Sequence, residues 1–192
     1  QLLKIKGRVL PMSSMPLEIE AEVTCEGQHE VVRGQVAVAT TTGHVDQLRL
    51  LPQDPPAQPE ALEAIESADF VIFGPGSWYT SIIPHLLVPD LYRSLCTTGA
   101  KKILSLNLLA EKETRGLSVA DHIRSFHAHA PDLRLDVILA DPQVIDDRLS
   151  IERAAHECGA RLLVRNVRMN DGTARHDPLR LAAAYRDAFD GV

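Results

Sequence analysis

The sequence predicts an α/β fold: a Rossmann-like, mostly parallel sheet with helices on both faces, and a small antiparallel β-hairpin near the N-terminus. From Pro59 onward, short apolar runs alternate with stretches of helical periodicity, which is the pattern of βαβ units. Before that point, residues 17–23 alternate between apolar and polar side chains, which is typical of a strand with one solvated face. A chain of 192 residues is long enough for one sizeable core, so we treat 1–192 as a single domain with a hairpin region (1–51) and a βα-repeat region (59–192).

The hairpin region contains two expected strands. The first covers residues 17–23, Glu26 and Gly27 form the turn, and the second covers residues 31–38. Four prolines between positions 52 and 59 then interrupt the pattern and indicate a linker. The last of them suits the first position of a helix, because proline has no N–H to lose there.

The βα-repeat region contains four expected strands, at residues 70–73, 102–106, 135–140 and 161–164. Ser118 and Asp121 have the spacing of a capping box at the start of one helix, and Asp177 is the expected cap of the last helix, residues 178–189. Right-handed crossovers place the carboxyl ends of parallel strands at one edge, where ligands of such sheets bind. The loops after Phe73, Leu106 and Ala140 should therefore share one crevice.

A glycine-rich turn follows the first of these strands and consists of Gly74, Pro75, Gly76 and Ser77. Glycines allow the backbone N–H groups to approach a ligand, proline stiffens the turn, and serine can cap the helix that follows. A helix N-terminus attracts anions, so we interpret this segment as a turn that binds a phosphate or a carboxylate. A purely structural strand-to-helix turn explains the spacing equally well. Trp78 and Tyr79, which follow, could stack on a base or sugar, although such aromatics more often fill the space between helix and sheet.

Polar residues in two later loops are further candidates. Asn107 ends the second strand and offers a donor and an acceptor to a base, ribose or sugar hydroxyl, or else bonds its own backbone in a turn. Glu113 and Thr114 can face the crevice because the helix begins only at Ser118. Arg175 could bind a diphosphate with both arms of its guanidinium, or be an unpaired surface arginine.

Composition excludes several functions. The net charge of −6 has the wrong sign for a nucleic-acid-binding protein, and no apolar run is long enough to span a membrane. Three widely spaced cysteines, Cys25, Cys96 and Cys158, suit reduced thiols and a cytoplasmic location. The histidines near position 125 lack the spacing of a zinc pair, and no nucleophile has a convincing base, so we assign neither metal ligands nor catalytic residues.

Two segments resemble the YvcK family of gluconeogenesis factors, relatives of the CofD phospholactate transferases. The first is residues 74–88, which departs from the family at Trp78 and His85, and the second is residues 107–123, which is one residue shorter than the family pattern. The resemblance covers essentially the whole chain. It also implies that a first strand and a glycine-rich turn precede this part of the polypeptide, and we expect that an upstream segment has been removed before Gln1.

The resemblance implies a regulator that binds a nucleotide sugar such as UDP-N-acetylglucosamine and links carbon metabolism to cell-wall precursor synthesis and cell shape. Its partners would be proteins of that synthesis, and a homo-oligomer is left open. The alternative is a CofD-like enzyme that transfers 2-phospho-L-lactate to a deazaflavin alcohol, with Mg²⁺ needed only in that case. A scaffold with a vestigial crevice is the third hypothesis. The residues expected at the ligand are Gly74, Pro75, Gly76, Ser77, Tyr79, Thr80, Asn107, Glu113, Thr114 and Arg175.

Overall fold

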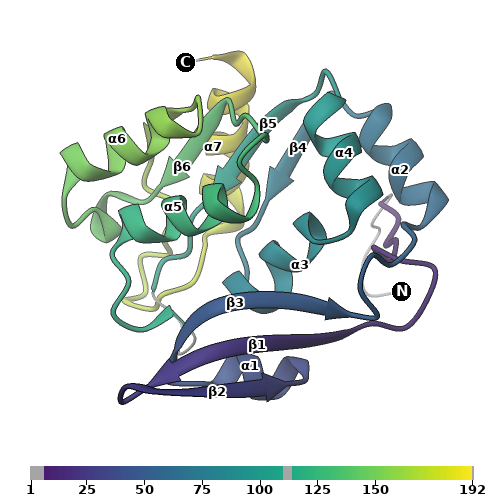
Figure 1. Cartoon of the computed structure of the whole chain (residues 1–192). Coiled ribbons are helices and arrows are strands. Elements are labelled where there is room, and N and C mark those ends of the chain that lie inside the picture. The colour runs from purple at the N-terminus through teal and green to yellow at the C-terminus, as the bar shows by residue number, and fades with distance from the viewer. Residues whose placement is uncertain (1–6, 110–113, 192) are drawn as a thin grey trace.

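The computed structural model describes residues 7–109 and 114–191 and contains two sheets (Figure 1). The larger sheet has four parallel strands in the order β4-β5-β6-β7. Their bounds are Phe70–Phe73, Lys101–Ser105, Val137–Ala140 and Arg161–Val164. The four strands predicted from the apolar runs are thus confirmed, with β6 two residues shorter at its start than expected.

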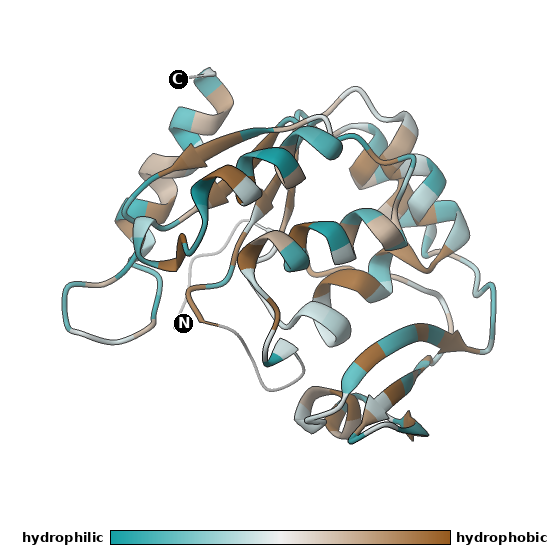
Figure 2. Cartoon of the chain, turned by 60° about the vertical axis from the view of Figure 1, so that its left-hand side comes forward, coloured by the Kyte–Doolittle hydropathy of each residue, from teal (hydrophilic) through white to brown (hydrophobic). Residues whose placement is uncertain are grey.

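Helices cover both faces of the parallel sheet, as predicted. On one face, α7 (Pro178–Asp190) packs its buried alanines, Ala184 and Ala188, onto a cluster that includes Ile103 and Leu163. On the other face lie α5 (Val119–His129) and α6 (Arg148–Glu157), which share a larger core with Leu104 and Ile138. Other helices after the antiparallel sheet are α2 (Pro59–Glu66), α3 (Ile83–Leu86), α4 (Pro89–Thr97), the π-helical turn η1 (Trp78–Ile82) and the short 3-10 turn η3 (Pro142–Val144). Figure 2 shows the brown, hydrophobic residues along the strands of this sheet.

The N-terminal region contains the expected antiparallel hairpin, with Glu26 and Gly27 at its turn, and one further strand. It is a three-stranded antiparallel sheet, in the order β2-β1-β3, with β1 at Glu18–Cys25, β2 at Gln28–Arg33 and β3 at His44–Leu51. The second expected strand, residues 31–38, is displaced: the observed strand begins three residues earlier and ends five residues earlier. It ends at Arg33 because Gly34 has a positive φ of 94°, and α1 (Gln35–Thr40) follows.

Sequence patterning missed β3 because its buried residues do not alternate regularly. Val45, Leu48 and Leu50 face the core, so the first two are three positions apart. The pairing of β1 with β3 shifts between Glu22 and Val23, which is the irregularity that this spacing requires.

The predicted helix starts have mixed outcomes. Ser118 and Asp121 form a complete capping box at α5, and the Asp177 carboxylate accepts hydrogen bonds from the backbone N–H groups of Leu179 and Arg180 at α7. Pro59 occupies the first turn of α2, as expected. Ser77 holds the N-cap position of η1, but its side chain makes no capping hydrogen bond. The predicted role of Ser77 as a cap is therefore wrong.

Candidate functional site

A crevice opens at the carboxyl ends of β5, β6 and β7. Its cavity measures about 430 Å³ and is lined by Trp78, Leu106, Asn107, Leu108, Leu109, Leu117, Val119, His122, Gln143, Val144, Asp146 and Arg168. The loops after Leu106 and Ala140 thus contribute to one crevice, as the strand order predicted. We call this cavity the crevice.

The glycine-rich turn lines a neighbouring cavity instead of the crevice. This second cavity, the β4 groove, measures about 360 Å³ and is lined by Ile65, Val71, Ile72, Phe73, Gly74, Pro75, Gly76, Ser81, Ile82, His85, Leu91 and Leu95. The expectation that all three loops share one crevice is therefore met by two of them. From the segment after β4, Trp78 reaches the crevice and the glycines do not.

Asn107 lies at the boundary between the two cavities. Its side-chain Nδ2 donates to the Gly76 carbonyl at 2.9 Å, and its Oδ1 accepts from the Gly76 backbone N–H at 3.0 Å. Asn107 lines the crevice and Gly76 lines the groove, so the pair forms part of the wall between them. The Gly76 N–H, one of the amides that we expected to bind an anion, is thus engaged within the protein. Anion binding at this turn stays a prediction.

Gly74 is required by sterics. Its φ is +76°, and a Cβ added there would lie 2.8 Å from the Ser105 carbonyl oxygen and 3.1 Å from Ile82 Cδ1. Gly76 is different, because an added Cβ would meet Ser81 Cβ at 3.6 Å, an ordinary contact. The turn after β4 therefore packs tightly against the end of β5 at its first glycine and has room at its second.

The aromatic residues after the turn are core residues. Trp78 is 1% exposed, and its ring meets the edge of the His122 ring with centroids 5.4 Å apart. Tyr79 is 2% exposed, with its hydroxyl 3.3 Å from Ser125 Oγ. Both are buried, as the second interpretation expected, but these contacts are with α5 and not with the sheet. Contact of Tyr79 with a ligand stays a prediction.

The remaining expected ligand residues are dispersed. Thr80 is buried and lines a third cavity, beside Met12 and Ile19. Thr114 is also buried, at 2% exposure. Glu113 lies outside the described residues. Contact of Thr80, Glu113 and Thr114 with a ligand stays a prediction.

Arg175 lies in the loop between β7 and α7 and already has a partner. Its Nη2 lies 3.0 Å from an Asp171 carboxylate oxygen, and its Nε donates to Thr173 Oγ1 at 3.2 Å. Hydrogen bonds from the Thr173 side chain and backbone, followed by the Arg175 side chain, lower the pKa of Asp171 to about 2. Because Arg175 pairs with Asp171, the interpretation as an unpaired surface arginine is wrong. Arg175 is not among the residues that line the crevice, and its contact with a diphosphate stays a prediction.

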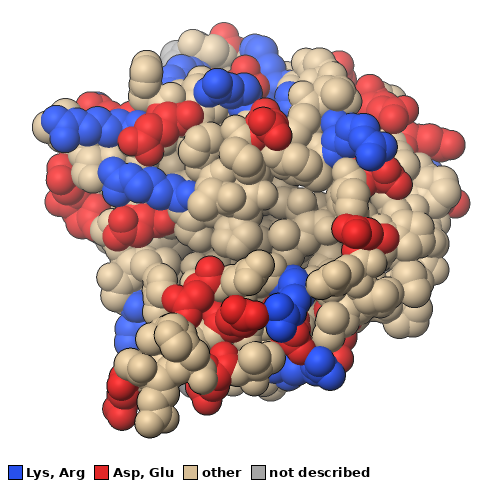
Figure 3. All heavy atoms as spheres, viewed as in Figure 1, with Lys and Arg blue, Asp and Glu red and all other residues tan. Residues whose placement is uncertain are grey.

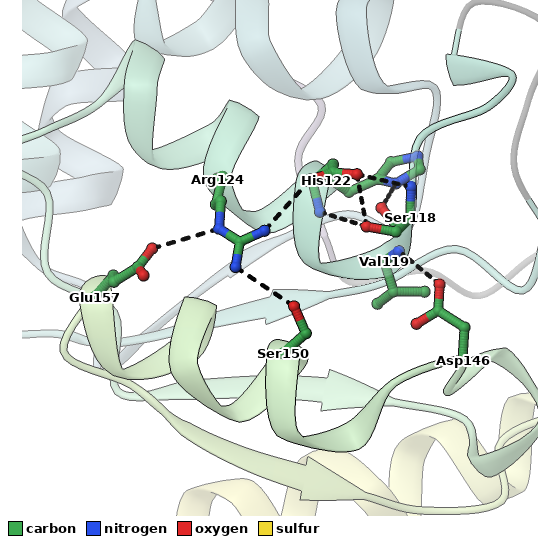
Figure 4. Close-up of polar contacts among 8 residues, drawn as sticks. Ser118, Val119, His122, Arg124, Asp146, Ser150 and Glu157 are labelled. Carbon is green, nitrogen blue, oxygen red and sulfur yellow. Dashed lines mark hydrogen bonds and ion pairs between the residues drawn. The ribbon is translucent and has the colours of Figure 1, made fainter.

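The start of α5 contributes Val119 and His122 to the lining of the crevice, and Figure 4 shows the polar contacts around it. The Ser118 hydroxyl donates to Asp121 at 2.6 Å, and this bond is the main cause that lowers the pKa of Asp121. One carboxylate oxygen of Asp146 accepts from the Val119 backbone N–H at 3.3 Å. Farther along α5, Arg124 Nε lies 3.7 Å from a Glu157 carboxylate oxygen, which ties α5 to α6. The capping box predicted from the sequence therefore positions one side of the crevice.

Asp141 organises the floor behind the crevice. It is 1% exposed, and its carboxylate accepts hydrogen bonds from the backbone N–H groups of Gln143 at 2.9 Å, Val167 at 2.9 Å and Arg168 at 3.2 Å. Three backbone donors on one carboxylate hold the loops after β6 and β7 together. Asp141 directly follows the predicted strand that ends at Ala140, but its use by the backbone of a distant loop has no local sequence signal.

Arg168 is a crevice residue that the sequence analysis did not select. Its Nη2 donates to the Leu108 carbonyl at 2.8 Å. Its backbone pairs with His176 across the base of the loop that carries Arg175. The signal that could have found it is its place four residues after a predicted parallel strand, because the loop after β7 meets the same sheet edge.

The described residues contain no group of three His, Cys, Asp or Glu side chains placed to hold a metal ion. No helix in the described part of the chain is long and apolar enough to cross a membrane. On the face drawn in Figure 3, blue and red side chains are interspersed, and no basic patch like that of a nucleic-acid-binding surface is visible there.

Comparisons with known proteins identify relatives. The sequence profile described as 2-phospho-L-lactate transferase CofD matches residues 1–173. A protein of Mycobacterium tuberculosis with the provisional name of a gluconeogenesis factor is 45% identical over 200 residues, which cover 100% of this chain and 57% of that protein. The Gluconeogenesis factor of Listeria innocua is 30% identical over 195 residues, which cover 95% of this chain and 60% of that protein. The resemblance to the YvcK family is thereby confirmed.

A solved structure shares the fold of this chain. A crystal structure of a UPF0052 family member from Bacillus halodurans has a TM-score of 0.80 and 26% identity, and covers 95% of this chain and 62% of its own. The chain therefore spans somewhat more than half the length of the relatives that it matches.

Proposed function

Because the chain belongs to the CofD family, we propose that it forms part of a nucleotide-sugar-binding regulator of the gluconeogenesis factor type, with UDP-N-acetylglucosamine as its ligand. The observation that carries this proposal is the crevice at the carboxyl ends of β5 to β7. Open parallel sheets bind nucleotides at this edge. A cavity of about 430 Å³ lies in the range typical of small-molecule sites.

The lining of the crevice suits such a ligand. Leucine and valine side chains and the Trp78 ring supply apolar walls for a base and an N-acetyl group. Asn107 and Gln143 supply amide groups that can both donate and accept hydrogen bonds to hydroxyls and carbonyls. Arg168 adds a positive charge. The expected contacts from the turn 74–77, Tyr79, Thr80, Glu113, Thr114 and Arg175 belong to this proposal.

Additional polypeptide would complete the site in the whole protein. Among the described residues, β4 pairs only with β5, and it leaves Phe70 and Ile72 37% and 38% exposed. An apolar strand with an open edge favours pairing with another strand. We therefore propose that a further strand, from the part of the protein that its relatives carry beyond the matched span, pairs with β4 and brings more donors to the ligand.

The regulator would act without turnover, in the cytoplasm, through protein partners of cell-wall precursor synthesis and with self-association left open. Three free cysteines are consistent with a reducing compartment. The CofD description favours the second candidate, a phospholactate transferase that acts on a deazaflavin alcohol. That reaction would call for Mg²⁺, and the described residues do not gather the ligands for it.

Calorimetry on the full-length protein separates the candidates. Saturable binding of UDP-N-acetylglucosamine, with weaker binding of GDP, supports the regulator. Selective binding of GDP together with a deazaflavin alcohol supports the transferase, and the absence of heat from either set supports a scaffold. The variant Gly76→Val is expected to stay folded, because an added Cβ has room, and to lose the nucleotide sugar if the turn contributes to binding. Unchanged affinity in this variant would remove the turn from the proposed site.

A further inference from the structure

Two buried hydrogen-bond donors in the lining of the crevice have no partner. They are the indole Nε1 of Trp78 and the guanidinium Nε of Arg168, and neither has a hydrogen bond in the part of the chain that the structure describes. Both groups can only donate. Buried donors without an acceptor are rare in folded proteins and costly to leave unpaired. Among the described residues, no acceptor is placed to pair with these two donors.

No described carboxylate lies within 4.0 Å of the Arg168 guanidinium. In the neighbouring segments, Arg165 pairs with Asp187 and Arg180 pairs with Asp177. The neighbours of the Arg168 guanidinium are neutral carbonyls, at 2.8 Å for Leu108 and 3.5 Å for Thr173. A half-buried guanidinium that meets only neutral acceptors gains from an anion placed beside it.

Arg168 is held in place before any ligand arrives. Its backbone N–H is bound by Asp141, and its Nη2 is bound by the Leu108 carbonyl on the opposite loop. A side chain that is fixed in advance loses less conformational entropy when it binds. Arg175 differs from Arg168 in two ways: its guanidinium already pairs with the Asp171 carboxylate, and its side chain is 68% exposed.

The other ionisable groups of the crevice do not replace Arg168. Asp146 is the acidic residue of the described lining, and its carboxylate accepts from the backbone N–H groups of Val119 at 3.3 Å and Asp147 at 2.7 Å. His122 Nδ1 lies 2.8 Å from the Ser118 carbonyl. Arg168 is thus the one Lys or Arg side chain among the described residues that line the crevice.

We propose that Arg168 is the residue that recognises the phosphate groups of the crevice ligand, with the leucine side chains against the apolar part. The ligand class is a phosphorylated small molecule with an apolar or aromatic portion, of which a nucleoside diphosphate is the proposed example. The identity of the nucleotide rests on the proposed function, whereas the role of Arg168 does not.

The test compares UDP, uridine and GDP by calorimetry on the full-length protein and three variants. Arg168→Gln should weaken UDP binding at least tenfold and leave uridine binding within twofold, because it removes the charge and keeps a polar side chain near Leu108. Arg168→Lys should restore part of the loss, since the charge returns without the planar fork. Arg148→Gln is the control, because that exposed arginine pairs with Glu152 on α6 and should change no affinity more than twofold. Thermal unfolding of each variant identifies any that fails to fold. If Arg168→Gln does not fold, the UDP and uridine affinities of Arg168→Lys decide the test.

Several results would overturn the proposal: UDP affinity that survives in Arg168→Gln, an equal loss of UDP and uridine binding, or no binding of either diphosphate to the wild-type protein. The two proposals also fail separately. If UDP-N-acetylglucosamine binds equally to wild type and Arg168→Gln, the proposed function stands and the role of Arg168 falls. If the wild-type protein binds GDP but no UDP compound, and Arg168→Gln no longer binds GDP, the role of Arg168 stands and the UDP-sugar function falls.

Discussion

The crevice and the β4 groove lie on either side of the Asn107–Gly76 pair and differ in their polar groups. In the groove, the Gly76 backbone N–H and carbonyl are both bonded to Asn107, and most other lining residues are apolar. In the crevice, two buried donors remain without an acceptor in the described structure. The groove therefore presents mainly apolar surface, whereas the crevice, which is the proposed ligand site, contains buried donors that lack a partner in the described structure.

The walls of the two cavities are also built differently. A buried carboxylate, Asp141, holds the loops behind the crevice through hydrogen bonds to the backbone. The turn beside the groove is fixed by the close approach of Gly74 to Ser105. The following variants test this difference, and the first is expected to have the largest effect.

Asp141→Asn should lower the free energy of unfolding by about 3 kcal/mol, the upper end for a charge-assisted hydrogen bond that is lost at a buried site. The asparagine would have to place an NH₂ group where one carboxylate oxygen now accepts from Val167 and Arg168. Urea denaturation measures the change. Asp146→Asn, at the exposed rim, is the control and should cost less than about 1 kcal/mol. Equal losses in the two variants would show that Asp141 does not organise the crevice floor.

Gly74→Ala should cost about 2 kcal/mol, since the added Cβ would lie 2.8 Å from the Ser105 oxygen and the backbone φ is positive. Gly76→Ala is the matched control two residues away, where the nearest contact is 3.6 Å, and should cost less than about 1 kcal/mol. Urea midpoints of the two variants give the comparison. If Gly76→Ala is the more damaging, the turn is not fixed by the packing of Gly74.

Local patterns predicted the parallel sheet well because its strands are short, apolar and separated by helices with their own start signals. The capping box at Ser118 and the cap at Asp177 needed only neighbouring residues, so both were found. The third strand of the antiparallel sheet was missed, because Val45 and Leu48 break the period of two at an irregular pairing with β1.

The site was predicted in outline and missed in detail for a related reason. Strand order alone placed the loops after Leu106 and Ala140 at one crevice. The partner of Asn107 and the arginine that lines the cavity depend on contacts between segments 31 or more residues apart. Asn107 bonds to Gly76, and Arg168 bonds to Leu108. No local signal identifies these partners.

Asn107→Ala tests the wall shared by both cavities. It removes both side-chain hydrogen bonds to Gly76 and should lower the free energy of unfolding by about 1–2 kcal/mol. Because the Gly76 N–H is then free, the variant also tests whether this amide binds an anion. A rise in pyrophosphate affinity, measured by calorimetry, would show that the turn can bind anions once Asn107 is absent. A variant as stable as wild type would show that the pair does not maintain the wall.

The smallest expected effect is a pH dependence that arises behind the crevice. Burial lowers the pKa of His176 below its ordinary value of 6.5, with Asp141 opposing and Arg168 reinforcing the shift. The folded protein therefore binds this proton less tightly than the unfolded chain does, so the contribution of His176 to stability is present above pH 6.5 and is lost as the pH falls through the lower, folded-state value.

Urea midpoints measured from pH 7.5 down to pH 5 should show this decline, and His176→Gln should flatten it because glutamine does not titrate. His156→Gln, at the exposed end of α6, is the control and should leave the slope unchanged. A wild-type slope that persists in His176→Gln would assign the titration to another group. A slope that disappears would assign the titration to His176, whose loop also carries Arg168, the one Lys or Arg side chain among the described residues that line the crevice.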